Sequence, residues 1–280
     1  MDKIFVLGSG VMGTGIAQTF AQSGFQVIVA DLQESIVSKA IAGVESRLAN
    51  QVKKEKITAA AKDGIMANLS GTTDFALAAD CAMVVEATIE SMDLKKKVFS
   101  QLDAICKAGT ILASNTSSLS ITEIASATSR PEDVIGMHFF NPAPVMKLVE
   151  LIRGMKTSQA VFDKTREITI AIGKEPVEVA EAPGFIVNRM LVPLVNEAVF
   201  ILQEGIASAE DIDTAMKCGA NHPMGPLALG DLMGLDVALA VLDILYKETG
   251  DPKYRACSLL RKYVRAGLLG RKTGQGVYKY

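Results

Sequence analysis

Short apolar runs alternate with amphipathic stretches along the first two-thirds of the chain. Residues 3–7 form a short, mainly apolar run that stops at Gly8, and a stretch with helical periodicity covers about residues 12–23. Residues 25–30 form a second, mainly apolar run that ends at Asp31. This strand–turn–helix–strand order predicts the opening of a parallel α/β sheet. Further strands are expected at about 82–85, 110–113, 134–139, 147–152 and 176–180, with helices at 93–106 and 158–172.

The pattern changes at Ala182-Pro183-Gly184, where two strong breakers interrupt it. Residues 1–184 predict a Rossmann-type, doubly wound and mainly parallel sheet, and residues 185–280 predict an all-helical second domain. Residues 34–62 are polar, helix-favouring and long for a single crossover, so we expect a helix or helical hairpin that projects from the sheet. The helices expected in the second domain lie near 185–204, 208–217, 231–249 and 252–266.

Composition narrows the class of protein. Apolar residues make up 49% and charged residues 21% of the 280 positions, and the formal net charge is -2. This balance is that of an ordinary globular protein, with no electrostatic basis for binding nucleic acid or an acidic membrane surface. No apolar run approaches the roughly 18 residues that a membrane-spanning helix needs. Because the first apolar run meets Gly8 too early for a secretory signal, we expect a cytoplasmic protein.

Cysteine and histidine spacing gives no metal or disulfide pattern. The two histidines, His138 and His222, lie far apart in sequence, and the cysteines are scattered without a CxxC pair. We therefore expect no metal site and reduced cysteines. A structural role is expected for His222. The cysteines are Cys81, Cys106, Cys218 and Cys257.

A GxGxxG motif follows the first predicted strand and opens the first predicted helix. In that context the glycines permit a tight turn, close approach to a pyrophosphate and close helix–sheet packing, while the helix N-terminus favours the anion. A glycine-rich turn without a ligand is the alternative. The predicted cofactor-binding residues of the motif are Gly8, Gly10, Val11, Met12 and Gly13.

Asp31 ends the second predicted strand, where a carboxylate can accept hydrogen bonds from the adenosine ribose. A carboxylate there repels a 2′-phosphate, and Leu32-Gln33 supply no arginine to receive one. The sequence therefore favours NAD over NADP. A turn or helix-cap aspartate is the alternative interpretation of Asp31.

Polar residues follow two of the later predicted strands. Residues 109–113 lead into Ser114-Asn115-Thr116-Ser117-Ser118, and residues 134–140, which include His138, lead into Asn141-Pro142. The carboxyl ends of parallel strands form the ligand crevice of such a sheet, so both segments are expected at its rim. His138 is the acid–base candidate because imidazole titrates near working pH. The alternative is a structural histidine packed beside two phenylalanines.

An ordered set of motifs resembles a known family over essentially the whole chain. Besides the glycine motif, it comprises Ser114 to Ser118, His138-Phe139-Phe140-Asn141-Pro142, Pro183 to Arg189 and Gly225-Pro226-Leu227. This order is similar to that of the 3-hydroxyacyl-CoA dehydrogenases, most closely their bacterial short-chain members. The resemblance implies reversible hydride transfer between NAD and C3 of a short-chain 3-hydroxyacyl-CoA, 3-oxoacyl-CoA being the product.

The resemblance also implies roles for four residues at the reacting atoms. His138 matches the catalytic histidine and Glu150 its carboxylate partner, which would fix the tautomer and stabilise the imidazolium. Ser117 matches the serine that hydrogen-bonds the reacting oxygen, and Asn188 the asparagine that contacts the substrate. Each role has an alternative. Glu150 could be an exposed strand residue paired with Lys147, Ser117 a solvated turn serine, and Asn188 a cap at the start of a helix. On chemistry alone Ser118 could replace Ser117.

Other positions match the family around the cofactor and around CoA. Glu90, Lys95 and Asn115 match cofactor positions, although Glu90 and Lys95 could equally be charges on a helix surface. The lysines of the segment after the second strand match the region that holds the CoA nucleotide, and lysine suits phosphate as a compact point charge. A solvated helix face is the alternative there. These lysines are Lys53, Lys54 and Lys56.

Two other functions fit parts of the same pattern. A dehydrogenase of free hydroxy acids would need a cationic clamp for the carboxylate, for which Arg189 and Arg153 are candidates. A catalytically silent dinucleotide-binding protein would be expected to lack the acid–base residues. The apolar helices of residues 185–280, together with the resemblance, predict a homodimer formed through the second domain.

Overall fold

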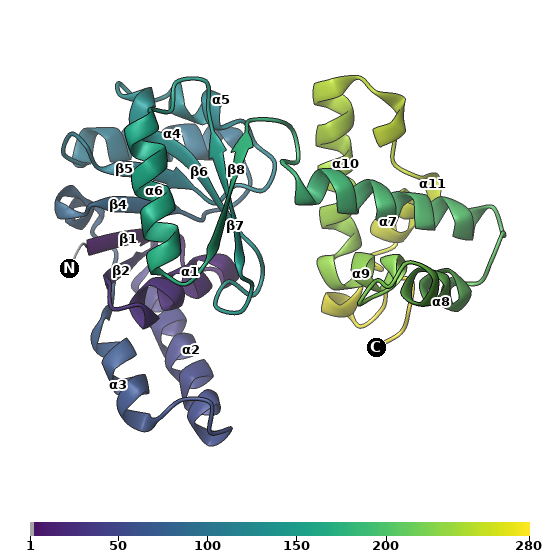
Figure 1. Cartoon of the computed structure of the whole chain (residues 1–280), viewed down its shortest axis with the longest axis horizontal. Coiled ribbons are helices and arrows are strands. Elements are labelled where there is room, and N and C mark those ends of the chain that lie inside the picture. The colour runs from purple at the N-terminus through teal and green to yellow at the C-terminus, as the bar shows by residue number, and fades with distance from the viewer. Residues whose placement is uncertain (1–2) are drawn as a thin grey trace. The chain divides into compact units, whose positions relative to one another are not determined.

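A mainly parallel sheet of eight strands is the centre of the first of two compact units, which are Met1–Ala182 and Pro183–Tyr280. The computed structural model describes residues 3–280. The strand order is β3-β2-β1-β4-β5-β6-β7-β8, and only the β6–β7 pair among these is antiparallel (Figure 1). The strands are β1 (Lys3–Leu7), β2 (Gln26–Ala30), β3 (Leu69–Thr72), β4 (Met83–Glu86), β5 (Ile111–Ser114), β6 (Val134–Phe139), β7 (Leu148–Arg153) and β8 (Glu175–Ala180).

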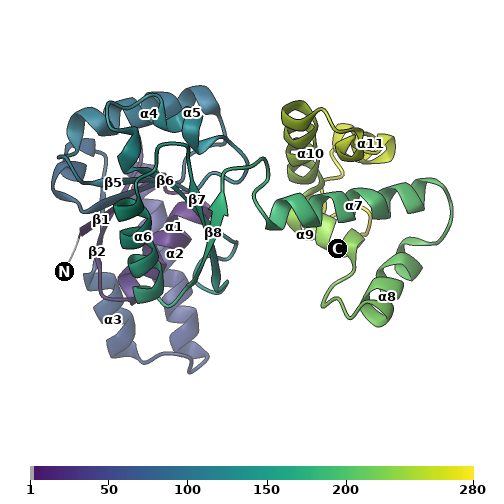
Figure 2. The same ribbon diagram turned by 45° about the horizontal axis from the view of Figure 1, so that its top comes forward.

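Helices cover both faces of this sheet. Buried side chains of α1 (Val11–Gln22) and α6 (Gln159–Ala171), such as Phe20 and Phe162, share one core with Val6 of β1. Figure 2 shows α4 (Met92–Ile105) and α5 (Ile121–Ala125) on the other side of the strands. The predicted Rossmann-type architecture is confirmed, and its parallel strands bring their carboxyl ends to one edge.

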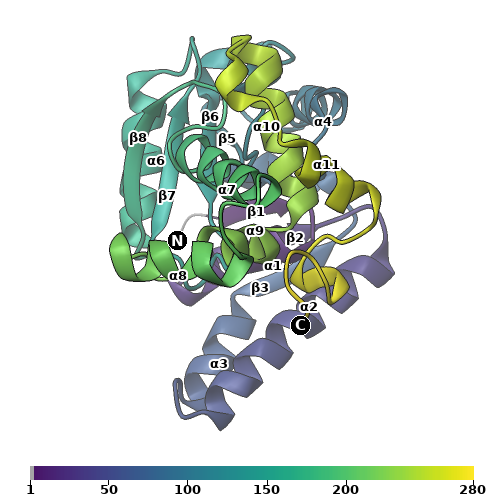
Figure 3. The same cartoon turned by 90° about the vertical axis from the view of Figure 1, so that its right-hand side faces the viewer.

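The segment after β2 forms a helical hairpin that extends away from the strands (Figure 3). Its first helix, α2 (Glu34–Lys53), buries one stripe, and the second, α3 (Ala59–Ala67), has no buried residue. The stripe consists of Val37, Ala40, Val44 and Leu48, spaced three or four residues apart as on one face of a helix. The hairpin leads into β3, an edge strand that the sequence pattern had not predicted.

The second unit is helical, as predicted, and packs its own apolar core around α7 (Val187–Gln203). The predicted single helix over 231–249 is wrong, because Gly234 adopts φ +95° and separates two helices. The predicted helix over 252–266 is shorter and follows a 3₁₀ turn, η3 (Pro252–Tyr254). The remaining helices of this unit are α8 (Ala209–Gly219), α9 (Pro226–Met233), α10 (Leu235–Thr249) and α11 (Ser258–Arg265).

The sequence predicted no membrane-spanning helix and reduced cysteines. Among residues 3–280, no helix has the length and apolar character needed to cross a bilayer. All four cysteines are free thiols; Cys81, Cys106 and Cys257 are buried and Cys218 is exposed. Burial raises the pKa of the Cys106 thiol to about 11, which keeps it protonated and unreactive.

Candidate active site

The glycine motif forms the turn between β1 and α1. Gly8 has φ +102°, and a Cβ there would lie 2.6 Å from the carbonyl oxygen of Ala87. At Gly13 a Cβ would lie 1.8 Å from the carbonyl oxygen of Gly8, so only glycine allows this helix to start so close to the strand. A Cβ at Gly10, in contrast, would face open space. The turn is therefore tight on its inner side and open on its outer side.

The N-terminus of α1 suits a pyrophosphate. Gly10 is the N-cap residue, no side chain caps it, and the first turn contains no acidic residue. Gly10 and Val11 are exposed, and Met12 is half-buried. The first amides of a helix without a cap attract an anion through hydrogen bonding and the helix dipole. The residues present thus fit the phosphates of a dinucleotide.

Asp31 follows β2 beside this turn. Its Oδ2 accepts hydrogen bonds from the backbone N–H of Ser9 at 2.9 Å and from the Ser9 hydroxyl at 2.6 Å, and its Oδ1 accepts one from the Leu32 N–H at 2.8 Å. Burial raises the pKa of Asp31, but the hydrogen bonds from Ser9 and Leu32 outweigh it and hold the pKa below its usual value. The ionised carboxylate keeps acceptor capacity for a ribose hydroxyl. By accepting hydrogen bonds from Ser9 and Leu32, Asp31 also stabilises the turn, which was the alternative interpretation of this residue.

His138 and Glu150 are directly opposite each other on the antiparallel strands β6 and β7. The imidazole Nδ1 lies 2.8 Å from Oε2 of Glu150. His138 is 6% exposed and Glu150 is 0% exposed, so the interpretation of Glu150 as a surface residue paired with Lys147 is wrong. The Phe140 ring stands 4.5 Å from the imidazole, centroid to centroid. A buried carboxylate in this place fixes the imidazole tautomer and stabilises the imidazolium.

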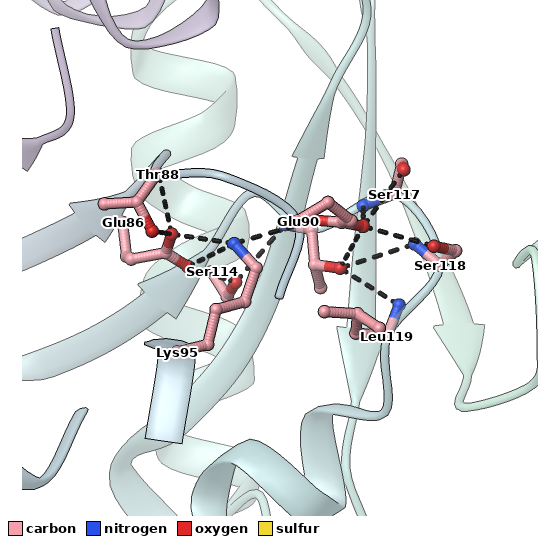
Figure 4. A network of polar contacts seen from close by, with 9 residues as sticks. Glu86, Thr88, Glu90, Lys95, Ser114, Ser117, Ser118 and Leu119 are labelled. Carbon is pink, nitrogen blue, oxygen red and sulfur yellow. Dashed lines mark hydrogen bonds and ion pairs between the residues drawn. The ribbon is translucent and has the colours of Figure 1, made fainter. Parts of the chain in front are cut away.

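The loop after β5 is organised by Glu90 (Figure 4). Oε1 of Glu90 accepts hydrogen bonds from the Ser117 N–H at 2.9 Å and from the Ser117 hydroxyl at 3.1 Å. The hydroxyls of Thr116 and Ser118 donate to the same oxygen at 2.7 and 3.2 Å. Ser117 is half-buried, and it is held at the edge of the sheet rather than placed in a solvated turn. We name residues 114–118 the serine loop.

Lys95 lies behind Glu90, and its side chain is 1% exposed. Its ammonium is 2.7 and 2.9 Å from the two carboxylate oxygens of Glu86 and 3.6 Å from Oε2 of Glu90. The interpretation of Lys95 as a charge on a helix surface is therefore wrong. Burial raises the pKa of Glu90, but the Lys95 charge and the hydrogen bonds from Thr116 and Ser117 outweigh it and lower the pKa.

Asn115 links the ends of β5 and β6. Its side-chain oxygen accepts a hydrogen bond from the N–H of Phe139 at 2.8 Å, next to His138. Asn188 belongs to the second unit and lies in the first turn of α7, whose N-cap residue is Ile186. Asn188 is therefore not the N-cap residue of α7, so its alternative interpretation as a helix cap is wrong.

The predicted CoA lysines lie where α2 ends and the hairpin turns. All three are exposed, and within the described residues none of them forms an ion pair shorter than 4.0 Å. In the same hairpin Lys62 is paired with Glu45 at 3.0 Å. The unpaired ammonium groups of Lys53, Lys54 and Lys56 are thus accessible to phosphate.

Two buried charges near the site were missed by sequence reasoning. Glu86 is the last residue of β4, and in the sequence it is simply a polar residue after an apolar run. Nothing in the sequence indicates that it pairs with Lys95. Lys174 precedes β8 as a lone lysine, yet its ammonium donates to the carbonyl oxygens of Ala143 at 2.6 Å and Met146 at 2.8 Å. Burial lowers the pKa of Lys174. Lys174 thereby fixes the loop that connects His138 to Glu150.

Comparison with known families matches both units. The family model described as 3-hydroxyacyl-CoA dehydrogenase, NAD binding domain, matches residues 3–182. The model of the C-terminal domain of 3-hydroxyacyl-CoA dehydrogenase matches residues 184–280. Together the two models account for nearly the whole chain.

Individual relatives agree with this match. The 3-hydroxybutyryl-CoA dehydrogenase of Clostridioides difficile is 54% identical over 278 residues, which are 99% of each chain. The human mitochondrial hydroxyacyl-coenzyme A dehydrogenase is 43% identical over all of this chain and 91% of its own. The crystal structure of (S)-3-hydroxybutyryl-CoA dehydrogenase from Ralstonia eutropha has a TM-score of 0.97 and 49% identity, and the match covers 100% of this chain and 99% of that one.

Proposed function

The chain belongs to the 3-hydroxyacyl-CoA dehydrogenase family, and we propose that it interconverts (S)-3-hydroxybutyryl-CoA and acetoacetyl-CoA with NAD as cofactor. The observation that carries the proposal is the buried His138–Glu150 pair beside the serine loop. An acid–base group with a fixed tautomer suits the removal of a carbinol proton. The glycine turn and Asp31 belong to the same unit and suit NAD.

Different residues of the protein transfer the proton and orient the substrate. His138 takes the proton of the 3-hydroxyl group during oxidation and returns it from the imidazolium during reduction. Glu150 stabilises the imidazolium, and Ser117 and Asn188 orient and polarise the reacting oxygen. When bound, NAD would supply the hydride-transfer chemistry at C3 in both directions.

Further residues are proposed to bind the two ligands. Glycines and amides of the turn hold the pyrophosphate and Asp31 the ribose, while Glu90, Lys95 and Asn115 shape the nicotinamide end of the site. Lys95 acts there through Glu90, because its ammonium is enclosed by carboxylates. The lysines of the hairpin bind the phosphates of CoA.

The free-acid alternative finds no support in its two arginines. Arg153 donates to Gln159 at 2.8 Å, is paired with Glu178 at 3.3 Å and lies over the Phe162 ring. Arg189 donates to the hydroxyl of Tyr254 at 3.1 Å. Both guanidinium groups thus have partners within their own units, whereas a carboxylate clamp needs a guanidinium directed at the substrate.

Two broader features complete the proposal. Three buried free thiols suit a reducing compartment, so we place the protein in the cytoplasm. The second unit, residues 183–280, is proposed to bind substrate and to form a homodimer. Large apolar side chains such as Leu232 and Val237 are exposed on it.

The function is tested by oxidation of NADH and of NADPH with acetoacetyl-CoA and, separately, with free acetoacetate. We expect rapid turnover of the thioester with NADH and little turnover with NADPH or with the free acid. Turnover of the free acid alone would establish the hydroxy-acid alternative. An absence of turnover with either substrate would indicate a silent dinucleotide-binding protein.

A further inference from the structure

Glu86 is a buried carboxylate at the end of β4 that has no part in the reaction as described above. It is 0% exposed, and both of its oxygens accept several hydrogen bonds (Figure 4). The N–H and hydroxyl of Thr88 donate to Oε1 at 2.7 and 2.6 Å, and the Ser114 hydroxyl donates to Oε2 at 2.7 Å. The Lys95 ammonium binds both oxygens. Glu86 therefore joins β4, α4 and the first residue of the serine loop.

We propose that Glu86 is a positioning residue for the dehydrogenase reaction. It holds the Lys95 ammonium at a fixed place behind Glu90 and so leaves Glu90, as a carboxylate, to orient Ser117. The inference rests on the proposed function, because it concerns the hydroxyl that contacts the reacting oxygen.

The distances support this division between two carboxylates. Lys95 approaches Glu86 to 2.7 Å but stays 3.6 Å from Oε2 of Glu90. The other oxygen of Glu90, Oε1, receives the donors of the serine loop, including both the N–H and the hydroxyl of Ser117. Lys95 thus supplies positive charge to Glu90 without displacing Ser117 from it. A buried ammonium needs a close counter-charge, and Glu86 provides one.

Removal of the Glu86 charge alone would change the position of the Lys95 ammonium between Glu86 and Glu90. The ammonium would then have Glu90 as its remaining carboxylate and would close the 3.6 Å gap, drawing Glu90 away from Ser117. Small displacements of an orienting group have large effects on rate, because the reacting atoms must stay aligned.

Removal of both charges would have a different effect. The groups that face Glu90 are the charged Lys95 from α4 and the uncharged side chains of the serine loop, with Glu86 of β4 behind Lys95. Lys95 lowers the pKa of Glu90 against the effect of burial, so without Lys95 this pKa rises. Glu90 then becomes protonated at a higher pH and ceases to bind Ser117 as a carboxylate.

The experiment compares four full-length proteins: wild type, Glu86→Gln, Glu86→Gln/Lys95→Met, and a control with Glu123→Gln/Lys96→Met. The control removes an exposed ion pair of 2.8 Å that also involves α4. Acetoacetyl-CoA reduction by NADH is measured as kcat and KM across the pH range, and folding is verified by circular dichroism.

We expect Glu86→Gln to lower kcat by up to about 10²-fold with KM for acetoacetyl-CoA within about twofold. In the double variant the acid limb of the kcat profile should move to higher pH. The alkaline limb should stay in place, because Glu90 is already ionised there. The control should reproduce the wild-type profile.

Three results would overturn the inference. One is wild-type kcat in Glu86→Gln; another is a loss that is equal at every pH in the double variant, which indicates a structural role alone. The third is failure of both variants to fold, because the contacts of Glu86 would then maintain the fold rather than the position of Ser117. Absence of turnover by the wild type would instead contradict the proposed function, so the two failures are distinguishable.

Discussion

His138 and Glu150 meet because the register of β6 and β7 places them directly opposite each other. Cross-strand neighbours lie close enough for a short contact without help from a flexible loop. Both side chains are buried, so the interaction between carboxylate and imidazole is weakly screened by water. The strand pairing therefore preorganises the two residues to which we assign proton transfer.

Substitution of either residue should separate catalysis from cofactor binding. We expect His138→Asn to lower kcat by at least about 10³-fold and Glu150→Gln by about 10²- to 10⁴-fold, because the charge that stabilises the imidazolium is lost. The Kd for NADH should stay within about twofold of wild type, as measured by fluorescence titration. The matched control is Glu178→Gln, whose carboxylate lies on β8 and faces Arg153. Turnover of Glu150→Gln above half the wild-type value would remove Glu150 from the mechanism.

The site residues that occur in motifs could be predicted from the sequence. Those that act only through contacts made in the folded structure could not. Ser117 and His138 follow apolar strands in recognisable surroundings, so their place at the sheet edge could be predicted. The partner of Ser117 could not be specified, because the contact with Glu90 depends on how two loops meet. Glu86 carried no signal at all, since an acidic residue at a strand end is ordinarily solvated.

Among the elements, those with strong apolar periodicity were predictable. The long apolar runs of the central strands gave correct positions, whereas β3 has the sequence Leu-Ser-Gly-Thr and too little apolar character to be recognised. The break at Gly234 was hidden because apolar periodicity continues on both sides of it. The antiparallel direction of β7 follows from the turn over residues 140–147, which sequence periodicity does not determine.

That turn is held from two sides. Lys174 binds the carbonyl oxygens of Ala143 and Met146, and Gly15 of α1 packs against Ala143 and Pro144 of the same turn. A Cβ at Gly15 would lie 3.2 Å from the Ala143 Cβ and 3.3 Å from the Pro144 Cδ. We expect the two hydrogen bonds from Lys174 to restrain this turn, so that the space above Gly15 does not readily expand.

Two glycines inside helices should therefore respond oppositely to the same substitution. Gly64→Ala, in α3, places its methyl group in open space, so the gain in helix propensity should stabilise the protein by about 0.5–1 kcal/mol. Gly15→Ala should destabilise it by about 1–2 kcal/mol, because overpacking exceeds that gain. Chemical denaturation of both variants measures the difference. A Gly15→Ala protein as stable as Gly64→Ala would show that the turn yields and that Lys174 does not restrain it.

On the scale of the whole molecule, each unit contains a core of its own. One core layer of the first unit lies between the sheet and α1 and α6, and the core of the second unit surrounds α7. The His138–Glu150 pair and the glycine turn belong to the first unit, and Asn188 to the second. The roles that we propose are thus assigned to residues of both units, which are joined in the chain at Ala182–Pro183.

The second unit is also where we expect two copies of the chain to associate. Leu232 of α9 and Val237 of α10 are exposed apolar residues close together in sequence, and contact with a second copy would remove them from water. Light scattering at tens of micromolar protein should give about twice the 29.7 kDa of one chain. Leu232→Glu/Val237→Glu should lower this mass towards one chain, because a buried carboxylate at an interface lacks a partner.

The control for this prediction is Met155→Glu, which introduces the same charge at an exposed apolar residue of the first unit. It should leave the measured mass unchanged. A wild-type mass of one chain at these concentrations would contradict the homodimer. A dimer that persists in Leu232→Glu/Val237→Glu but is lost in Met155→Glu would instead assign the interface to the first unit. Activity measured on the same samples would then indicate whether catalysis depends on association, since each chain carries its own His138–Glu150 pair.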